Sequence, residues 1–154
     1  MQILTISTDR LFADSQFGRR VTDEIEAESA VLAAENERII GELSREEGAL
    51  TDRRASMEPE AFRLLADAFD QKVQENRANQ KAKLDALAVR TDQAQAIFFE
   101  AARPVLENLM RETGAGIILE RSGVFLSADS TDITQLAIAR IDAAIGDGTS
   151  LSDQ

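Results

Sequence analysis

Ser56-Met57-Glu58-Pro59-Glu60 separates two long runs of helix-forming residues in a chain of 154 residues. The first run extends from Arg19 to Met57 and the second from Glu60 to Thr113, with few helix-breaking residues in either. Proline cannot continue a helix, but it suits the first position of one. The sequence therefore predicts an antiparallel helical hairpin over residues 19–113, with its tip near residues 58–59.

Apolar residues recur along both runs with a heptad-like spacing, which predicts a seam between two packed helices. In the second run this seam passes through Asn76 and Gln80, and polar seam residues lower stability. Gly41 and Gly48 lie in the first run, and each costs up to about 1 kcal/mol relative to Ala. We expect the central part of the hairpin to be its weakest part.

Short β-rich segments lie near both ends of the chain. Residues 2–7 predict a buried strand, and residues 117–120 and 124–127 predict two strands of a β-hairpin. Ser130-Thr131-Asp132 should cap a last amphipathic helix, and residues 146–154 predict a disordered tail. The hairpin returns the chain to its origin, so residues 1–18 and 114–145 should form one head. The predicted fold class is α+β and mostly α.

A three-stranded sheet with one helix can bury only a small core. Association of several heads would complete that core, and joining the sheets of different copies would remove their open edges. We expect the chain to form a homo-oligomer through apolar residues of the three strands: Ile3, Leu4, Ile6, Ile117, Leu119, Val124 and Leu126.

Composition excludes several function classes. The chain has 17 Lys and Arg residues and 28 Asp and Glu residues, so its net charge is −11. Proteins that bind nucleic acid usually carry a basic surface, and no such surface dominates here. The chain has no His and no Cys, which argues against zinc or copper sites and against Ser-His or thiol catalysis. No apolar stretch approaches the ~20 residues that span a bilayer. We therefore expect no enzyme, no cofactor and at most peripheral membrane contact.

Adjacent apolar pairs in the helical runs indicate a binding surface. Ile39-Ile40, Leu64-Leu65 and Phe98-Phe99 each place two large side chains about 100° apart, and a two-helix seam covers only one of each pair. The second side chain could pack on the flank of the partner helix or remain exposed for binding. The candidate binding residues are Ile40, Leu43, Leu64, Phe69 and Phe98.

Three segments carry a resemblance to a known family: Ile3 to Phe12 with Ser15 and Gly18, Gly116 to Glu120 with Val124-Phe125, and Asp132-Ile133-Thr134. Their order resembles that of the Skp (OmpH-like) periplasmic chaperones over residues 3–145. The resemblance implies a jellyfish-shaped homotrimer, in which strands of three subunits form a β-barrel body and three helical tentacles enclose a cavity. In that family the cavity holds unfolded outer-membrane proteins in the periplasm without ATP.

The resemblance also implies that any signal peptide has been removed from this chain. The best-known members of that family are strongly basic, whereas residues 44–66 of this chain carry four arginines and five carboxylates. A lipopolysaccharide site is therefore not carried over.

Two alternative functions remain open at this point. One is a structural coiled-coil oligomer that acts as a scaffold, for which unbroken heptads would be expected. The other is a prefoldin-like cytosolic chaperone, although prefoldin-type chains usually keep their strands at the hairpin turn.

Overall fold

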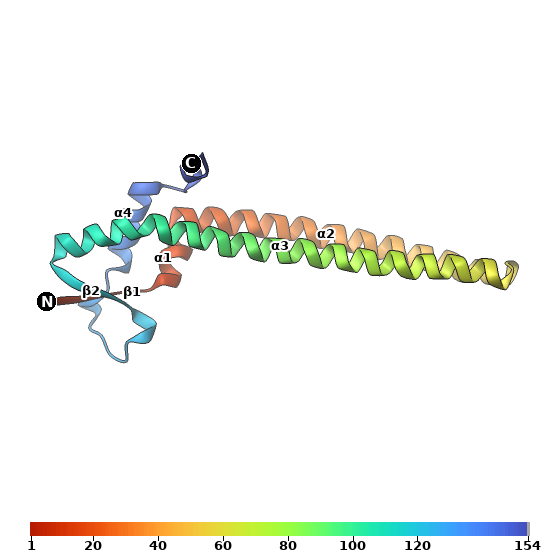
Figure 1. Ribbon diagram of the computed structural model, residues 1–154, viewed down its shortest axis with the longest axis horizontal. Helices are drawn as coiled ribbons and strands as arrows, with labels where there is room; N and C mark the ends of the chain where they lie inside the picture. Colours follow the sequence, from red (N-terminus) through yellow and green to blue (C-terminus); the bar gives the residue numbers. More distant parts are fainter. Residues whose placement is uncertain (154) are drawn as a thin grey trace. The chain divides into compact units, whose positions relative to one another are not determined.

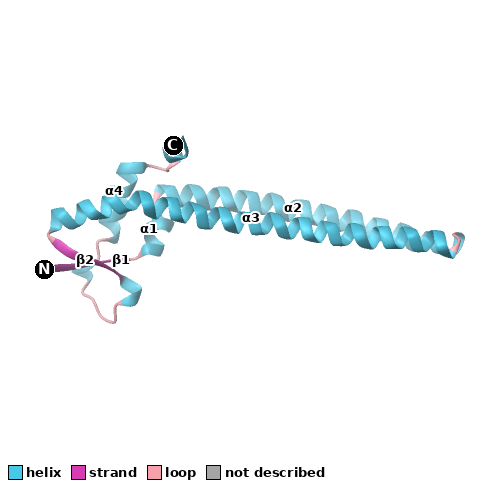
Figure 2. Ribbon diagram, viewed as in Figure 1, coloured by secondary structure: helices cyan, strands magenta, loops and turns pink. Residues whose placement is uncertain are grey.

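The computed structural model describes residues 1–153 and is mostly helical, as the sequence predicts (Figure 2). The chain forms two compact units. The hairpin unit is Glu26–Val89, and the terminal unit is Met1–Ile25 with the chain from Arg90 onward. The terminal unit is thus larger than the predicted head of residues 1–18 and 114–145. The main elements are β1 (Gln2–Ile6), α1 (Thr8–Asp14), α2 (Gln16–Arg53), α3 (Pro59–Thr113), β2 (Ala115–Glu120) and α4 (Thr134–Ile145).

The sheet of the terminal unit consists of two parallel strands (Figure 2). Ile3 pairs with Ile117 and Thr5 with Leu119, and the long helical segment between the strands supplies the crossover that parallel pairing requires. The predicted β-hairpin is wrong, because β2 pairs with β1 and residues 124–127 form no strand. A 3₁₀ turn, Arg121–Gly123, ends β2 and redirects the chain.

The core of the terminal unit is aromatic. The ring centroid of Phe98 lies 5.4 Å from that of Phe12 and 5.5 Å from that of Phe17. Apolar side chains of α1, α2, α3 and α4 surround this cluster, with Ile6 of β1. The fully buried members include Leu11, Phe98, Ala102, Ala137 and Ile141.

A tight corner joins α1 to α2, and here α2 begins at Gln16 rather than after Gly18 as expected. The Ser15 hydroxyl donates to the Phe12 carbonyl at 2.8 Å and accepts from the Gly18 amide at 3.0 Å. A Cβ on residue 18 would lie 1.6 Å from the Phe12 carbonyl oxygen. Glycine is therefore required at this position, because any side chain would force the two helices apart.

The predicted disordered tail is wrong for residues 146–151. Gly148 has φ +79° and packs so closely on Phe17 that a Cβ would lie 1.9 Å from its ring. Arg20 Nε donates to the Asp147 carbonyl at 2.7 Å, and Leu151 packs against the core. The sequence suggested disorder because the segment is rich in Gly and polar residues, but its glycines form turns here and Leu151 supplies an apolar contact with the core. Residue 154 lies outside the described residues.

In the hairpin unit, α2 and α3 lie side by side (Figure 1). Pro59 opens α3, as predicted, after an extended Met57. Lys72 Nζ lies 2.8 Å from a Glu46 carboxylate oxygen, and Lys83 Nζ lies 2.9 Å from one of Glu35. Both pairs of residue numbers sum to 118 (72 + 46 and 83 + 35), so the helices are antiparallel in constant register between these pairs.

A carboxylate network ties the end of β2 to the chain around β1 and α4. A Glu120 carboxylate oxygen accepts from the Thr8 amide at 2.9 Å, and Asp132 accepts from the Thr134 amide at 2.9 Å and from Arg121. Hydrogen bonds from Thr8 hold the pKa of Glu120 below its usual range, and those from Thr134, with Arg121, do the same for the pKa of Asp132. These bonds favour the ionised form in the folded protein.

Acid should therefore weaken the fold, and Asp132→Asn should remove part of this sensitivity. A carboxyl whose pKa is lowered on folding stabilises the protein above its unfolded pKa, and this contribution is lost progressively below about pH 5. Urea unfolding from pH 7 to pH 3 should show Asp132→Asn less stable at pH 7, with the difference shrinking as the pH falls. Asp129 is exposed and lies 3.1 Å from Arg121, so Asp129→Asn is the control and should have a smaller effect. A pH-independent difference would contradict the argument.

Candidate functional site

A groove lies between α2 and α3 of the hairpin unit, with a volume of about 740 Å³. Ile39, Ile40 and Leu43 of α2 and Phe69 and Val73 of α3 form its apolar part. We call it the mid-hairpin groove. Its other lining residues are Asn36, Ser44, Glu47, Asp70, Asn76, Arg77 and Gln80.

The helix register explains why this groove is open. In the constant register, Leu43 stands near Asn76 and Ile39 near Gln80, so large apolar side chains on α2 face amides on α3. Asn76 and Gln80 are half-buried, which confirms their predicted place on the seam. An amide cannot interdigitate with Leu or Ile as another apolar side chain would. The seam is therefore incompletely filled here, and Ile40 stays 57% exposed.

The structure brings together three of the five candidate binding residues. Ile40, Leu43 and Phe69 all line the mid-hairpin groove. Leu64 is not among its lining residues, but it lies on α3 of the same unit and is 72% exposed. The proposal of Phe98 is wrong, because Phe98 is fully buried in the core of the terminal unit. Phe98 forms a three-ring cluster with Phe12 and Phe17 in this core. Phe99, the second member of the pair, is partly buried and packs against the core.

The sequence reasoning placed other residues incorrectly or did not single them out. Leu84 and Leu87 both belong to the apolar pattern of the second run, but Leu84 is more than half exposed, whereas Leu87 is buried. Ile39 and Val73 also line the groove, although neither was predicted to bind a client. Their place in the groove depends on the register between α2 and α3. In the sequence, the only signal for this register is the opposite charge of Lys72 and Glu46 and of Lys83 and Glu35, which pair in the structure.

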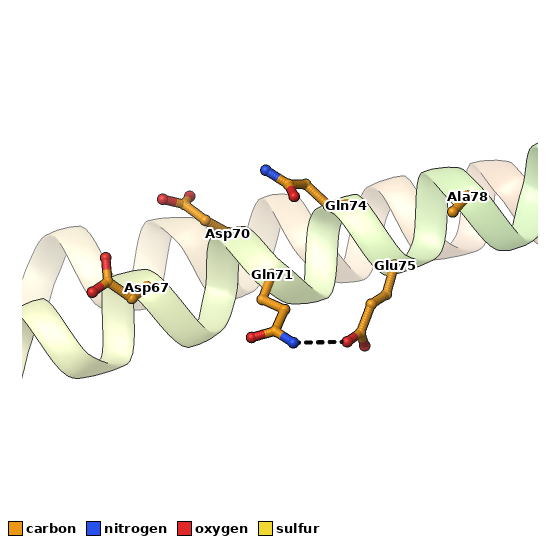
Figure 3. Close-up of a pocket in the computed structure, with 6 residues that line it drawn as sticks. All are labelled: Asp67, Asp70, Gln71, Gln74, Glu75 and Ala78. Atoms are coloured by element: carbon orange, nitrogen blue, oxygen red, sulfur yellow. Dashed lines mark hydrogen bonds between the residues drawn. The ribbon is translucent and has the colours of Figure 1, made fainter.

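An acidic face borders the groove on α3. Figure 3 shows the carboxylates of Asp67 and Asp70 extending away from the helix, whereas Gln71 Nε2 donates to Glu75 at 3.1 Å. Asp70 lines both this face and the mid-hairpin groove. All six lining residues come from one helix, so the face is a shallow depression rather than an enclosed pocket. No group of three potential metal ligands occurs among the described residues.

The second exposed apolar surface lies on the sheet of the terminal unit. Ile3, Ile117 and Leu119 point to one face of the sheet and are each about two-fifths exposed. In the loop after β2, Phe125 is 97% exposed and Leu126 is 83% exposed. We refer to these five exposed residues, three on the sheet and two in the loop, as the open sheet face. Among the described residues, β2 pairs with β1 alone, so its outer edge is free.

Three of the predicted oligomerisation residues, Leu4, Ile6 and Val124, do not belong to the open sheet face. Leu4 and Ile6 are buried within the chain itself. Their side chains point to the opposite face of the sheet from Ile3, because successive residues of a strand alternate. That opposite face packs on the helices, with Ile6 in the core and Ile118 against it. Val124 is half-buried at the start of the loop.

The family model for outer membrane proteins of the OmpH-like type matches residues 2–141. The chain belongs to the OmpH-like family. A crystal structure from Caulobacter crescentus CB15, described as a candidate OmpH-like outer membrane chaperone, has the same fold with a TM-score of 0.85. The alignment covers 94% of this OmpH-like chain and 85% of that chain at 18% identity. No protein of curated function matches the sequence.

The family match agrees with the resemblance found in the sequence and covers both units of this OmpH-like chain. It separates the chain from the prefoldin-like alternative. Among the described residues, no helix of the OmpH-like chain is both long and apolar enough to cross a membrane.

Proposed function

We propose that the protein is an ATP-independent holdase chaperone of the periplasm, which binds unfolded outer-membrane proteins between the hairpins of a homotrimer. Membership of the OmpH-like family supports this function. The observation that carries the proposal is the mid-hairpin groove, where Ile40, Leu43 and Phe69 present apolar surface beside half-buried amides. Such a surface would bind apolar client segments weakly and could adapt to many of them.

The open sheet face supports the trimer in this proposal. Monomeric proteins rarely expose large contiguous apolar patches, and free strand edges invite pairing with another chain. In our proposal the outer edge of β2 pairs with the loop at residues 124–128 of a neighbouring copy. Three such contacts would close a barrel, and Ile3, Ile117 and Leu119 would fill its interior together with Phe125 and Leu126. Val124 and Ala128 already have extended backbone conformations, which suits this pairing.

Replacing Ile40 and Leu64 with Ser should weaken the holdase activity. Both side chains are mostly exposed, so the fold should lose little stability, whereas client contact should lose about 1.5–3 kcal/mol for each side chain that a client buries fully. Light scattering after dilution of a urea-unfolded outer-membrane barrel measures the effect. The wild-type protein should suppress aggregation near one trimer per client, and the double variant should require a severalfold excess.

The control replaces Val31 and Val89 with Ser; both are also mostly exposed in the hairpin unit, but neither lines the groove or was predicted to bind a client. This variant should retain suppression close to that of the wild type. If the wild-type protein fails to suppress aggregation at severalfold excess, the chaperone proposal is wrong and the scaffold interpretation replaces it.

A further inference from the structure

We infer that the mid-hairpin groove selects polypeptide segments in which apolar residues are flanked by Lys or Arg. This inference rests on the proposed function, because it names the chemistry of the client segment that the groove would hold. Its basis is the juxtaposition of an apolar groove with carboxylates that have no cation of their own.

The groove has the volume of a binding site, and one part of its lining is apolar. Its volume, about 740 Å³, falls within the usual range for ligand pockets. Ile40, Leu43 and Phe69 would contact the side chains of an extended segment, and the amides of Asn76 and Gln80 can hydrogen-bond to its backbone.

Carboxylates dominate the charges at one side of the groove. Glu47 and Asp70 line the groove itself, and Asp67 and Glu75 continue the acidic face on α3 (Figure 3). Glu47, Asp67 and Asp70 are exposed and form no ion pair within the part of the chain that the structure describes. Arg77 is the cation that lines the groove, and it cannot balance all of them.

The lysines of this region are already paired with other carboxylates. Lys72 contacts Glu46 and Lys83 contacts Glu35, both across the hairpin. Lys81 contacts Asp85 on its own helix at 2.8 Å. Over residues 26–89 there are 9 basic and 14 acidic residues, so the net charge of the hairpin unit is 9 − 14 = −5. An acidic client would be repelled by this charge. A basic side chain of the ligand could instead pair with the carboxylates near the groove.

The physical consequence is a preference that depends on salt. A Lys or Arg next to an apolar segment could reach Asp67 or Asp70 while that segment occupies the groove. Each exposed ion pair contributes modestly, by a factor of about 1.4 to 5, and three together should give about tenfold. Because these charges are exposed, added salt should reduce the preference. At 0.1 M salt the Debye length is about 10 Å, so exposed charges further apart than this interact little.

The test uses fluorescent peptides that share one apolar core and carry Lys, Ser or Glu at both flanks. Fluorescence anisotropy with the full chain at low ionic strength should show the Lys-flanked peptide binding about tenfold more tightly than the Ser-flanked one. The Glu-flanked peptide should bind more weakly still. The variant Glu47→Gln, Asp67→Asn, Asp70→Asn should lose about tenfold affinity for the Lys-flanked peptide and none for the Ser-flanked peptide.

A matched control removes three other carboxylates that line neither the groove nor the acidic face: Asp23→Asn, Glu26→Gln, Asp52→Asn. It should retain most of the preference, because it changes the net charge equally but leaves the groove intact. Equal binding of all three peptides to the wild-type protein would overturn this inference while leaving the proposed function standing. Failure of every peptide to bind would overturn the groove as a client site. A change in solution mass on Ile40→Ser would show that a second copy, not a client, covers the groove.

Discussion

Leu119→Asp is expected to lower the solution mass of the protein from three chains to one. Leu119 lies on the open sheet face, opposite Thr5 in the strand pairing, and is exposed in the single chain. A carboxylate there remains hydrated in a monomer, so the fold of one chain should persist. In the proposed trimer the same carboxylate would be buried without a partner, and an unpaired buried charge typically costs 3–5 kcal/mol. Each of the three copies in the trimer would carry this cost, so the trimer should dissociate.

Size-exclusion chromatography with light scattering measures the outcome at micromolar concentration. Circular dichroism should show that the helical content of Leu119→Asp is unchanged. Leu64→Asp is the control, because it makes the same change at an exposed leucine of the hairpin unit and should leave the mass at three chains. A wild-type monomer, or a Leu119→Asp trimer, would contradict the assembly that we propose.

The helical part of the fold could be predicted from the sequence because its signals are local. Pro59 fixes the start of α3, and the seam through Asn76 and Gln80 follows from a spacing that needs no knowledge of the partner helix. The polar seam also indicated where packing would be poorest, and the mid-hairpin groove lies there.

The strand pairing could not be predicted, because it depends on contacts distant in sequence. Residues 117–120 and 124–127 have the composition of a hairpin, but β2 pairs with β1 from more than a hundred residues away, and a 3₁₀ turn follows β2 in place of a hairpin turn. The strand sequences also do not predict which face of each strand packs against the core. Leu4 and Ile6 pack inside the chain while Ile3 does not, and the choice depends on helices that the strand sequence does not encode.

Phe98→Ala is expected to destabilise the protein by about 3–5 kcal/mol, the usual cost of truncating a buried Phe. The ring is fully buried, with Phe12, Phe17 and Phe99 all within 5.5 Å between centroids. These three rings come from α1, α2 and α3, so the cavity would open where three elements meet and could not collapse easily. Urea unfolding followed by circular dichroism measures the change, at one fixed chain concentration because the proposed assembly would add to stability.

Ile97→Ala is the matched control, since Ile97 is the preceding residue of α3 and is half-exposed. It should shift the free energy of unfolding by less than about 1 kcal/mol, because little buried area is lost and Ala favours the helix. The pair of variants also separates the two roles considered for Phe98. A core residue gives a large loss of stability, whereas a client-binding residue would give unchanged unfolding with impaired suppression of aggregation. That second result would contradict the packing described for the terminal unit and return Phe98 to the binding surface.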